Sequence, residues 1–174
     1  MTFGIALIRF ALFCVIVGIV LMIVGMAIPR RFRPDAFPFR PWRFETPEFF
    51  KRLRVSRWKG YMPDASRVVR GMTRKLAGND SSSVHLARLV QETCVAELTH
   101  WVLMAICPAS LVFAPCEWTP LFILLYDIGN LPFIVIQRYN RPRMMKILRM
   151  REERERAWHT GPWLTRYGLR RWTK

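Results

Sequence analysis

The chain has 174 residues, of which 52% are hydrophobic, and it carries a formal net charge of +16. So positive a charge often indicates a nucleic-acid partner, but here the cations flank long apolar runs, where anionic lipid headgroups are the usual attraction. We therefore expect no nucleic acid among the partners. The apolar residues gather in long runs instead of alternating, which excludes an ordinary soluble domain.

Three apolar runs are each long enough to cross a bilayer: Phe3–Ile28, Val95–Ala114 and Trp118–Ile136. The first run is too long for a secretory signal and lacks a basic leader, so we expect it to be retained as an anchor. The sequence predicts an all-α integral membrane protein with about three transmembrane helices plus amphipathic cytoplasmic helices. Its expected divisions are a first transmembrane helix (1–28), a basic cytoplasmic or interfacial segment (29–92), a transmembrane helical hairpin (93–137) and a basic cytoplasmic tail (138–174).

Cations fill the segment Arg30–Arg88 and the tail Arg138–Lys174, whereas the hairpin near Pro115–Thr119 has none. The positive-inside rule then places the N-terminus outside and both cationic segments in the cytoplasm. Three spans are consistent with this, because an odd number puts the N-terminus and the tail on opposite sides. We expect a multi-pass protein of the bacterial cell membrane.

After the first run, residues 30–47 contain too many prolines for a continuous helix. Thr46, followed by proline, predicts the start of a short interfacial helix. Asp64–Ala77 is expected to form a second helix. From Ser83 a helix is expected to rise into the second span, and the tail is expected to be helical to about Trp158.

The third run carries polar groups on one side. At ~100° per residue, six of them fall within roughly 120° of arc: Tyr126, Asp127, Asn130, Gln137, Arg138 and Arg141. The opposite side is apolar: Leu124, Ile128, Leu131 and Val135. Polar side chains in a span usually face protein or a water-filled cavity, so this stripe is predicted to be the wall of a site.

The second run opens with Thr93, Glu97 and His100 on one helical face. Glu97 lies one turn from His100, where it could orient the imidazole as a general base for a hydroxyl group. A structural hydrogen bond between helices, with Asn130 or Asp127, is the competing interpretation. Glu-x-x-His also occurs in di-iron bundles, but the chain has no second such pair, so no metal is expected.

The block Gln137–Arg143 places three arginines around Tyr139 and Asn140, which suits binding of phosphates or a carboxylate. A stop-transfer cluster that fixes topology is the alternative. Trp58 and Lys59 form a second cationic-aromatic candidate, for which an interfacial anchor is the other interpretation.

Two segments, Glu92–Trp101 and Asn130–Arg143, and more weakly Arg54–Lys59, resemble the bacterial glycosyl-4,4'-diaponeurosporenoate acyltransferase family of staphyloxanthin-type carotenoid biosynthesis. The resemblance implies a membrane acyltransferase that esterifies a sugar hydroxyl of a glycosylated carotenoid, or a related glycolipid, with a long-chain fatty acyl group.

On this hypothesis His100 deprotonates the hydroxyl, and Glu97 orients the imidazole of His100. Asn130 and Gln137 hold the acceptor or the developing oxyanion. Substrate and donor binding would fall to the cationic blocks: Arg138, Arg141 and Arg143 on the donor's phosphates, with Tyr139, Asn140, Trp58 and Lys59 beside them. No cofactor is expected beyond an acyl-CoA or acyl-carrier donor, and membrane lipids and a glycolipid acceptor are the expected partners.

Two other functions are compatible with the residues. The first is another lipid-modifying transferase, such as a methyltransferase, that uses the same arginines for a different donor. The second is a non-enzymatic polybasic membrane scaffold. The scaffold predicts that Arg→Lys changes at Arg138 and Arg141 are harmless, whereas a binding site predicts damage, because lysine cannot make bidentate contacts.

Overall fold

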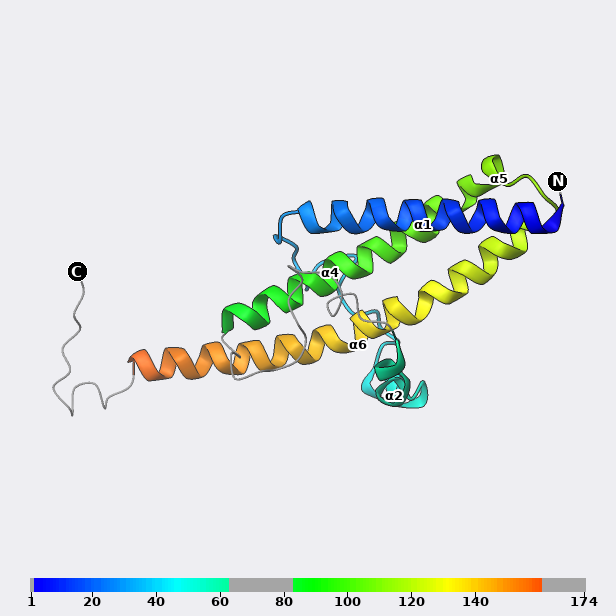
Figure 1. Ribbon diagram of the computed structural model, residues 1–174. Coiled ribbons are helices and arrows are strands. Elements are labelled where there is room, and N and C mark those ends of the chain that lie inside the picture. The colour runs from blue at the N-terminus through cyan, green and yellow to red at the C-terminus, as the bar shows by residue number, and fades with distance from the viewer. Residues whose placement is uncertain (1, 63–82, 161–174) are drawn as a thin grey trace.

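The computed structural model describes residues 2–62 and 83–160 (Figure 1). This part of the chain is built from helices, turns and extended connections. In chain order the helices are α1 (Phe3–Ala27), α2 (Pro47–Arg52), α3 (Val55–Trp58), η1 (Lys59–Tyr61), α4 (Ser83–Ile106), η3 (Cys107–Ala109), α5 (Ser110–Phe113) and α6 (Thr119–Thr160). The helix expected over Asp64–Ala77 lies outside the described residues.

Three helical stretches are long and apolar enough to cross a membrane: Phe3–Ala27, Ser83–Phe113 and Thr119–Trp158. They confirm the prediction of an all-α membrane protein with three spans. Most of α1 exposes large apolar side chains, as a helix that faces lipid does.

Helices α4 and α6 run antiparallel, and α1 lies along the part of this pair that is joined by the short connection through α5 (Figure 1). Ala6, Phe10, Cys107, Ala114 and Phe122 form the buried core at that end. At the other end, the first turns of α4 and the C-terminal half of α6 extend beyond α1. The molecule is therefore a three-helix bundle continued by a two-helix extension.

Residues 28–46, which we call the strap, leave α1 and reach α2 without forming a helix, as their prolines predict. Gln91 of α4 holds the strap through Phe32: the Phe32 N–H donates to Gln91 Oε1 at 2.8 Å, and Gln91 Nε2 donates to the Phe32 carbonyl at 2.9 Å. The strap is thus fixed to the bundle by hydrogen bonds to its backbone.

Helix α2 begins where the sequence predicts, with the Thr46 hydroxyl accepting from the Phe49 N–H at 3.2 Å. Phe50 and Val55 pack against Tyr139 of α6 and anchor α2 and α3 beside the middle of that helix (Figure 1). One aromatic of the predicted interfacial helix is therefore buried against protein, because Tyr139 offers it an apolar partner.

The divisions expected at residues 92/93 and 137/138 fall inside the continuous helices α4 and α6. Helix α6 passes through Pro132 and Pro142 without ending. The change from apolar to cationic sequence near Arg138 therefore occurs within one helix and is not a boundary between two elements.

Gly25 of α1 packs closely against α4. A Cβ added there would lie 3.3 Å from Val95 Cγ1 and 3.5 Å from Thr99 Oγ1, whereas a Cβ at Gly18 would meet nothing within 4 Å. We expect Gly25→Leu to destabilise the protein by about 1–3 kcal/mol through overpacking. Gly18→Leu is the matched control and should leave thermal stability in detergent unchanged. Equal melting temperatures for the two variants would contradict this packing.

Candidate functional site

The carboxylate of Glu97 lies fully buried (0% exposed) between α4 and α6. Its Oε1 accepts from Arg138 Nη1 and its Oε2 from Arg141 Nη2, each at 2.5 Å. Trp101 Nε1 lies 3.4 Å from Oε1. Both oxygens are thus occupied by groups other than His100, which corrects the expectation that Glu97 orients the imidazole.

All five N–H donors of Arg138 have acceptors. Nε donates to Glu45, Nη1 to Glu97 and to the Pro38 carbonyl at 3.1 Å, and Nη2 to Glu45 Oε2 at 2.9 Å and to the Arg40 carbonyl at 3.0 Å. Arg138 therefore has no donor left for a phosphate, and its expected role in donor binding does not fit this geometry.

Arg141 is 2% exposed and uses four of its five donors. Nε donates to Thr93 Oγ1 and Nη2 to the Thr93 carbonyl, both at 3.0 Å, while Nη1 donates to the Phe39 carbonyl at 2.9 Å and Nη2 also to Glu97. Among the described residues, one Nη1 hydrogen of Arg141 has no acceptor. Arg141, unlike Arg138, therefore keeps a donor there.

Glu45, Glu97, Arg138 and Arg141, which we call the ion-pair layer, join three parts of the fold: the strap, α4 and α6. Two guanidinium groups are costly to bury unless each is paired and fully hydrogen-bonded. Here two carboxylates balance the charge, and four backbone carbonyls and a threonine hydroxyl accept the remaining bonds. The layer is primarily a structural connection.

His100 lies one turn further along α4. Its Nδ1 is 2.8 Å from Asn130 Oδ1, and Asn130 Nδ2 donates to the Tyr126 carbonyl at 2.9 Å. Since this second bond turns Oδ1 toward the ring, Nδ1 must carry the hydrogen, and the neutral imidazole has its lone pair on Nε2. Phe133 stacks on the ring with centroids 4.8 Å apart and 12° between the planes. The structure thus contains the hydrogen bond to Asn130 that is the competing structural interpretation, and Nε2 of His100 has no hydrogen-bond partner among the described residues.

A cavity of about 140 Å³ opens between α1 and α4, and we call it the His100 groove. Its lining is mostly apolar: Met22, Gly25, Met26, Arg30, Glu92, Val95, Ala96, Thr99 and His100. Gly25 is close to the end of α1, whose last carbonyls accept from the Arg30 guanidinium. His100 therefore lies near the boundary between apolar helix and cationic strap.

The remaining cationic-aromatic residues form a separate group around Tyr139, which is buried. Arg143 stacks on the Tyr139 ring at 3.8 Å, and Lys59 Nζ lies 4.8 Å from the same ring and 3.4 Å from Asn140 Oδ1. Trp58 packs on the same cluster. The two predicted cationic-aromatic blocks therefore meet in space, and they dock α3 and η1 onto α6.

The polar stripe of α6 faces the protein, as predicted, while Leu124, Ile128 and Leu131 on the other side are exposed. Gln137 is buried, and among the described residues its Oε1 has no hydrogen-bond partner. That oxygen could accept a hydrogen from an acceptor hydroxyl. Asn130, in contrast, has both ends of its amide engaged by protein.

Sequence reasoning missed Glu45, the strap carbonyls and Phe133. A signal existed for Glu45, because two buried arginines require two carboxylates and Glu97 supplies only one. The carbonyls could not be found in this way, since every residue has one and only the path of the strap selects Pro38, Phe39 and Arg40.

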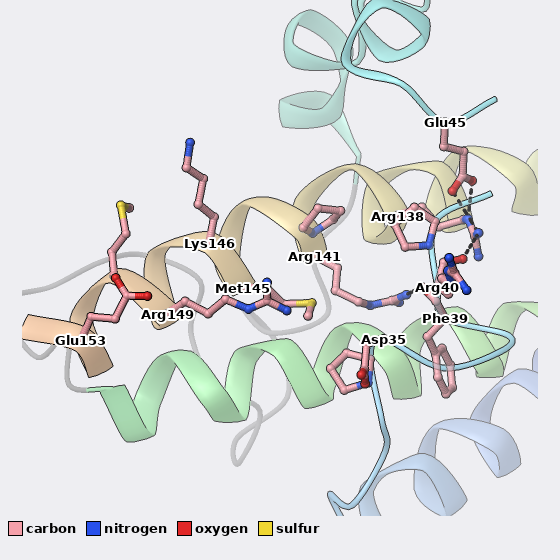
Figure 2. A pocket seen from close by; sticks show the side chains of 14 residues that line it. Asp35, Phe39, Arg40, Glu45, Arg138, Arg141, Met145, Lys146, Arg149 and Glu153 are labelled. Carbon is pink, nitrogen blue, oxygen red and sulfur yellow. Dashed lines mark hydrogen bonds and ion pairs between the residues drawn. The ribbon is translucent and has the colours of Figure 1, made fainter. Parts of the chain in front are cut away.

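A second and larger cavity, of about 600 Å³, lies between the strap and the C-terminal half of α6 (Figure 2). We call it the strap cleft. Arg138, Arg141 and Glu45 lie at its inner end, whereas Lys146, Arg149 and Glu153 follow along α6 toward the outer end.

The ion-pair layer predicts a large cost for removing its central charge. Glu97→Gln would leave two buried guanidinium groups with one carboxylate, and we expect it to lower the free energy of unfolding by about 3–5 kcal/mol. Thermal unfolding in detergent measures this, and Glu117→Gln, on the exposed hairpin, is the control. Unchanged stability would show that the layer is not essential. Arg138→Lys should also destabilise, for structural reasons, so that substitution cannot separate an enzyme from a scaffold.

Comparison with known proteins identifies the family of the chain. Residues 31–150 match the model of the glycosyl-4,4'-diaponeurosporenoate acyltransferase family. The enzymes of that name from Staphylococcus aureus strains bovine RF122 / ET3-1 and N315 are 28% and 27% identical over 155 residues, covering 84% of this chain and 93% of each relative. No solved structure shows significant similarity. The matched region contains the ion-pair layer, His100 and Asn130. The chain belongs to the glycosyl-4,4'-diaponeurosporenoate acyltransferase family and is an acyltransferase.

Proposed function

We propose that this protein transfers a long-chain fatty acyl group to a sugar hydroxyl of a glycosylated carotenoid, or of a related membrane glycolipid. The observation that carries the proposal is His100, which lines a groove between two membrane helices; Asn130 fixes its tautomer, and its Nε2 has no hydrogen-bond partner among the described residues. The family supplies the reaction class, and this histidine supplies a base suited to it.

The reaction needs one proton to move. Nε2 of His100 takes the proton of the sugar hydroxyl as its oxygen attacks the carbonyl carbon of an acyl thioester. The C–S bond breaks, the acyl group becomes an ester, and the imidazolium returns the proton to the departing thiolate. Asn130 is a positioning residue, because it holds Nδ1 and thereby keeps the basic nitrogen directed away from α6.

The His100 groove suits an acceptor with an apolar tail and a sugar head. Met22, Val95 and Ala96 offer an apolar surface, and Thr99 adds a hydroxyl beside the histidine. The groove lies at the end of α1 that adjoins the cationic strap, so a tail could stay in the bilayer while the sugar reaches the interface. Gln137 does not line this groove; its side chain is buried, and its Oε1 has no hydrogen-bond partner among the described residues.

The proposal includes an orientation in the bacterial cell membrane: hairpin outside, and strap and C-terminal half of α6 in the cytoplasm. Soluble acyl donors would then meet the lipid acceptor on the cytoplasmic side. In a background with the four cysteines replaced by alanine, we expect Glu117→Cys to react with a membrane-impermeant maleimide on intact cells. Arg154→Cys should react only after lysis. Labelling of both positions on intact cells would rule out this orientation.

Removal of the base should abolish turnover without unfolding the protein. We expect His100→Ala to reduce the rate of acyl transfer by roughly 10²–10⁴-fold. Mass spectrometry of lipids from a host that accumulates glycosylated carotenoid acid should detect a species heavier by one fatty acyl group only with the intact chain. Asn130→Ala should retain part of the rate, because the base persists but loses its orientation.

Added imidazole tests the base directly. In membranes that contain His100→Ala, we expect free imidazole to restore part of the rate, which a purely structural histidine would not allow. Full activity of His100→Ala would refute the assignment of the base. Absence of acylated carotenoid with the intact chain would refute this acceptor and direct the search to other glycolipids.

A further inference from the structure

The strap cleft has the size of a ligand site and lies outside the His100 groove. Its volume of about 600 Å³ is in the range of pockets that hold small molecules and cofactor arms. Strap residues Pro34, Phe39 and Pro41 line it from one side, and Pro142, Met145 and Met150 of α6 from the other. These residues give the cleft an apolar lining between charged groups.

The charged side chains along the cleft differ in whether they form ion pairs. Arg138 and Arg141 are balanced by Glu45 and Glu97, so the ion-pair layer has no net charge. Lys146 and Arg149 are exposed and make no ion pair within the described residues. Figure 2 shows Arg149 lying along α6 toward Met145, and Lys146 extending on the side away from α4.

Among the other lining residues, Arg40 is a third cation, and Asp35 and Glu153 are anions. The open part of the cleft therefore has one positive charge in excess, which suits the binding of a phosphate group. At the inner end, Arg141 adds the Nη1 hydrogen that has no acceptor among the described residues.

The cleft is also elongated. From Glu153 to Arg138 it follows sixteen residues of α6, or about 22 Å of helix. Its inner end is the ion-pair layer, where Glu97 lies about 4.5 Å along the α4 axis from His100. A slender arm bound by one phosphate at the outer end would thus reach the ion-pair layer with its far end.

We propose that the strap cleft binds the phosphopantetheine arm of the acyl donor, with Lys146 and Arg149 on its phosphate and the arm passing over Met145 and Pro142. This inference rests on the proposed acyl transfer from a thioester. Coenzyme A and acyl carrier protein both contain this arm, and the cleft recognises the part that they share.

The test is binding of phosphopantetheine to the full chain in phosphatidylcholine nanodiscs, measured by calorimetry. Pantetheine, which lacks the phosphate, should bind at least about tenfold more weakly, because charge-assisted hydrogen bonds are lost. Lys146→Gln/Arg149→Gln should weaken binding of phosphopantetheine by a similar factor. Arg151→Gln/Arg154→Gln removes the same charge from a different face of α6, outside the cleft, and should change binding less than twofold.

Three results would overturn the proposal: equal affinity for pantetheine, equal weakening by the two double variants, or displacement of phosphopantetheine by phosphatidylglycerol in the nanodisc. The last would assign the cleft to a lipid headgroup. Tighter binding of coenzyme A than of holo-carrier protein would identify the donor as a coenzyme A thioester, and the reverse order would identify the carrier; both support the arm.

Different results would refute the cleft assignment and the proposed acyl transfer. His100→Ala should bind phosphopantetheine as the intact chain does. If the intact chain binds the arm but forms no acyl ester, the proposed function is wrong and the cleft stands. If acyl transfer proceeds unchanged in Lys146→Gln/Arg149→Gln, the cleft assignment is wrong and the function stands.

Discussion

The buried carboxylate of Glu97 is the constraint on which the site depends. It lies between two arginines of α6, and these arginines also hold three carbonyls of the strap. Because an unpaired charge is costly in a protein interior, α4, α6 and the strap must come together in one arrangement to satisfy the layer. That arrangement forms the strap cleft on one side and sets the level of His100 on the other.

A neutral amide, and not a carboxylate, holds the histidine. Asn130 fixes the tautomer without adding a negative charge at the membrane boundary, where an unpaired carboxylate would be costly. The contacts give these residues different roles: Glu97 joins the helices and the strap, and Asn130 orients the imidazole of His100. Among the described residues, Nε2 of His100 has no hydrogen-bond partner. From α4 and the membrane half of α6, the proposed reaction requires a histidine base and a residue that orients it.

The substrates of the proposed reaction differ in solubility, and the fold offers each a different environment. The His100 groove lies between two membrane helices, whereas the strap cleft lies between the strap and the C-terminal half of α6. The strap forms part of the cleft and begins where α1, a wall of the groove, ends. A lipid acceptor and a soluble donor can therefore approach from different sides of the same pair of helices.

The sequence by itself determined the helical class, the three spans and the inward polar stripe, because run length and helical periodicity are local properties. It also indicated the family through Glu92–Trp101 and Asn130–Arg143. Only the tertiary structure decided the partners. From the sequence alone, Glu97 and Asn130 are equally plausible hydrogen-bond partners of His100. Glu45 lies far from Arg138 along the chain, so the sequence does not indicate that they pair. Which carboxylate pairs with which cation depends on how the strap crosses the bundle, and that path is set by packing between distant segments.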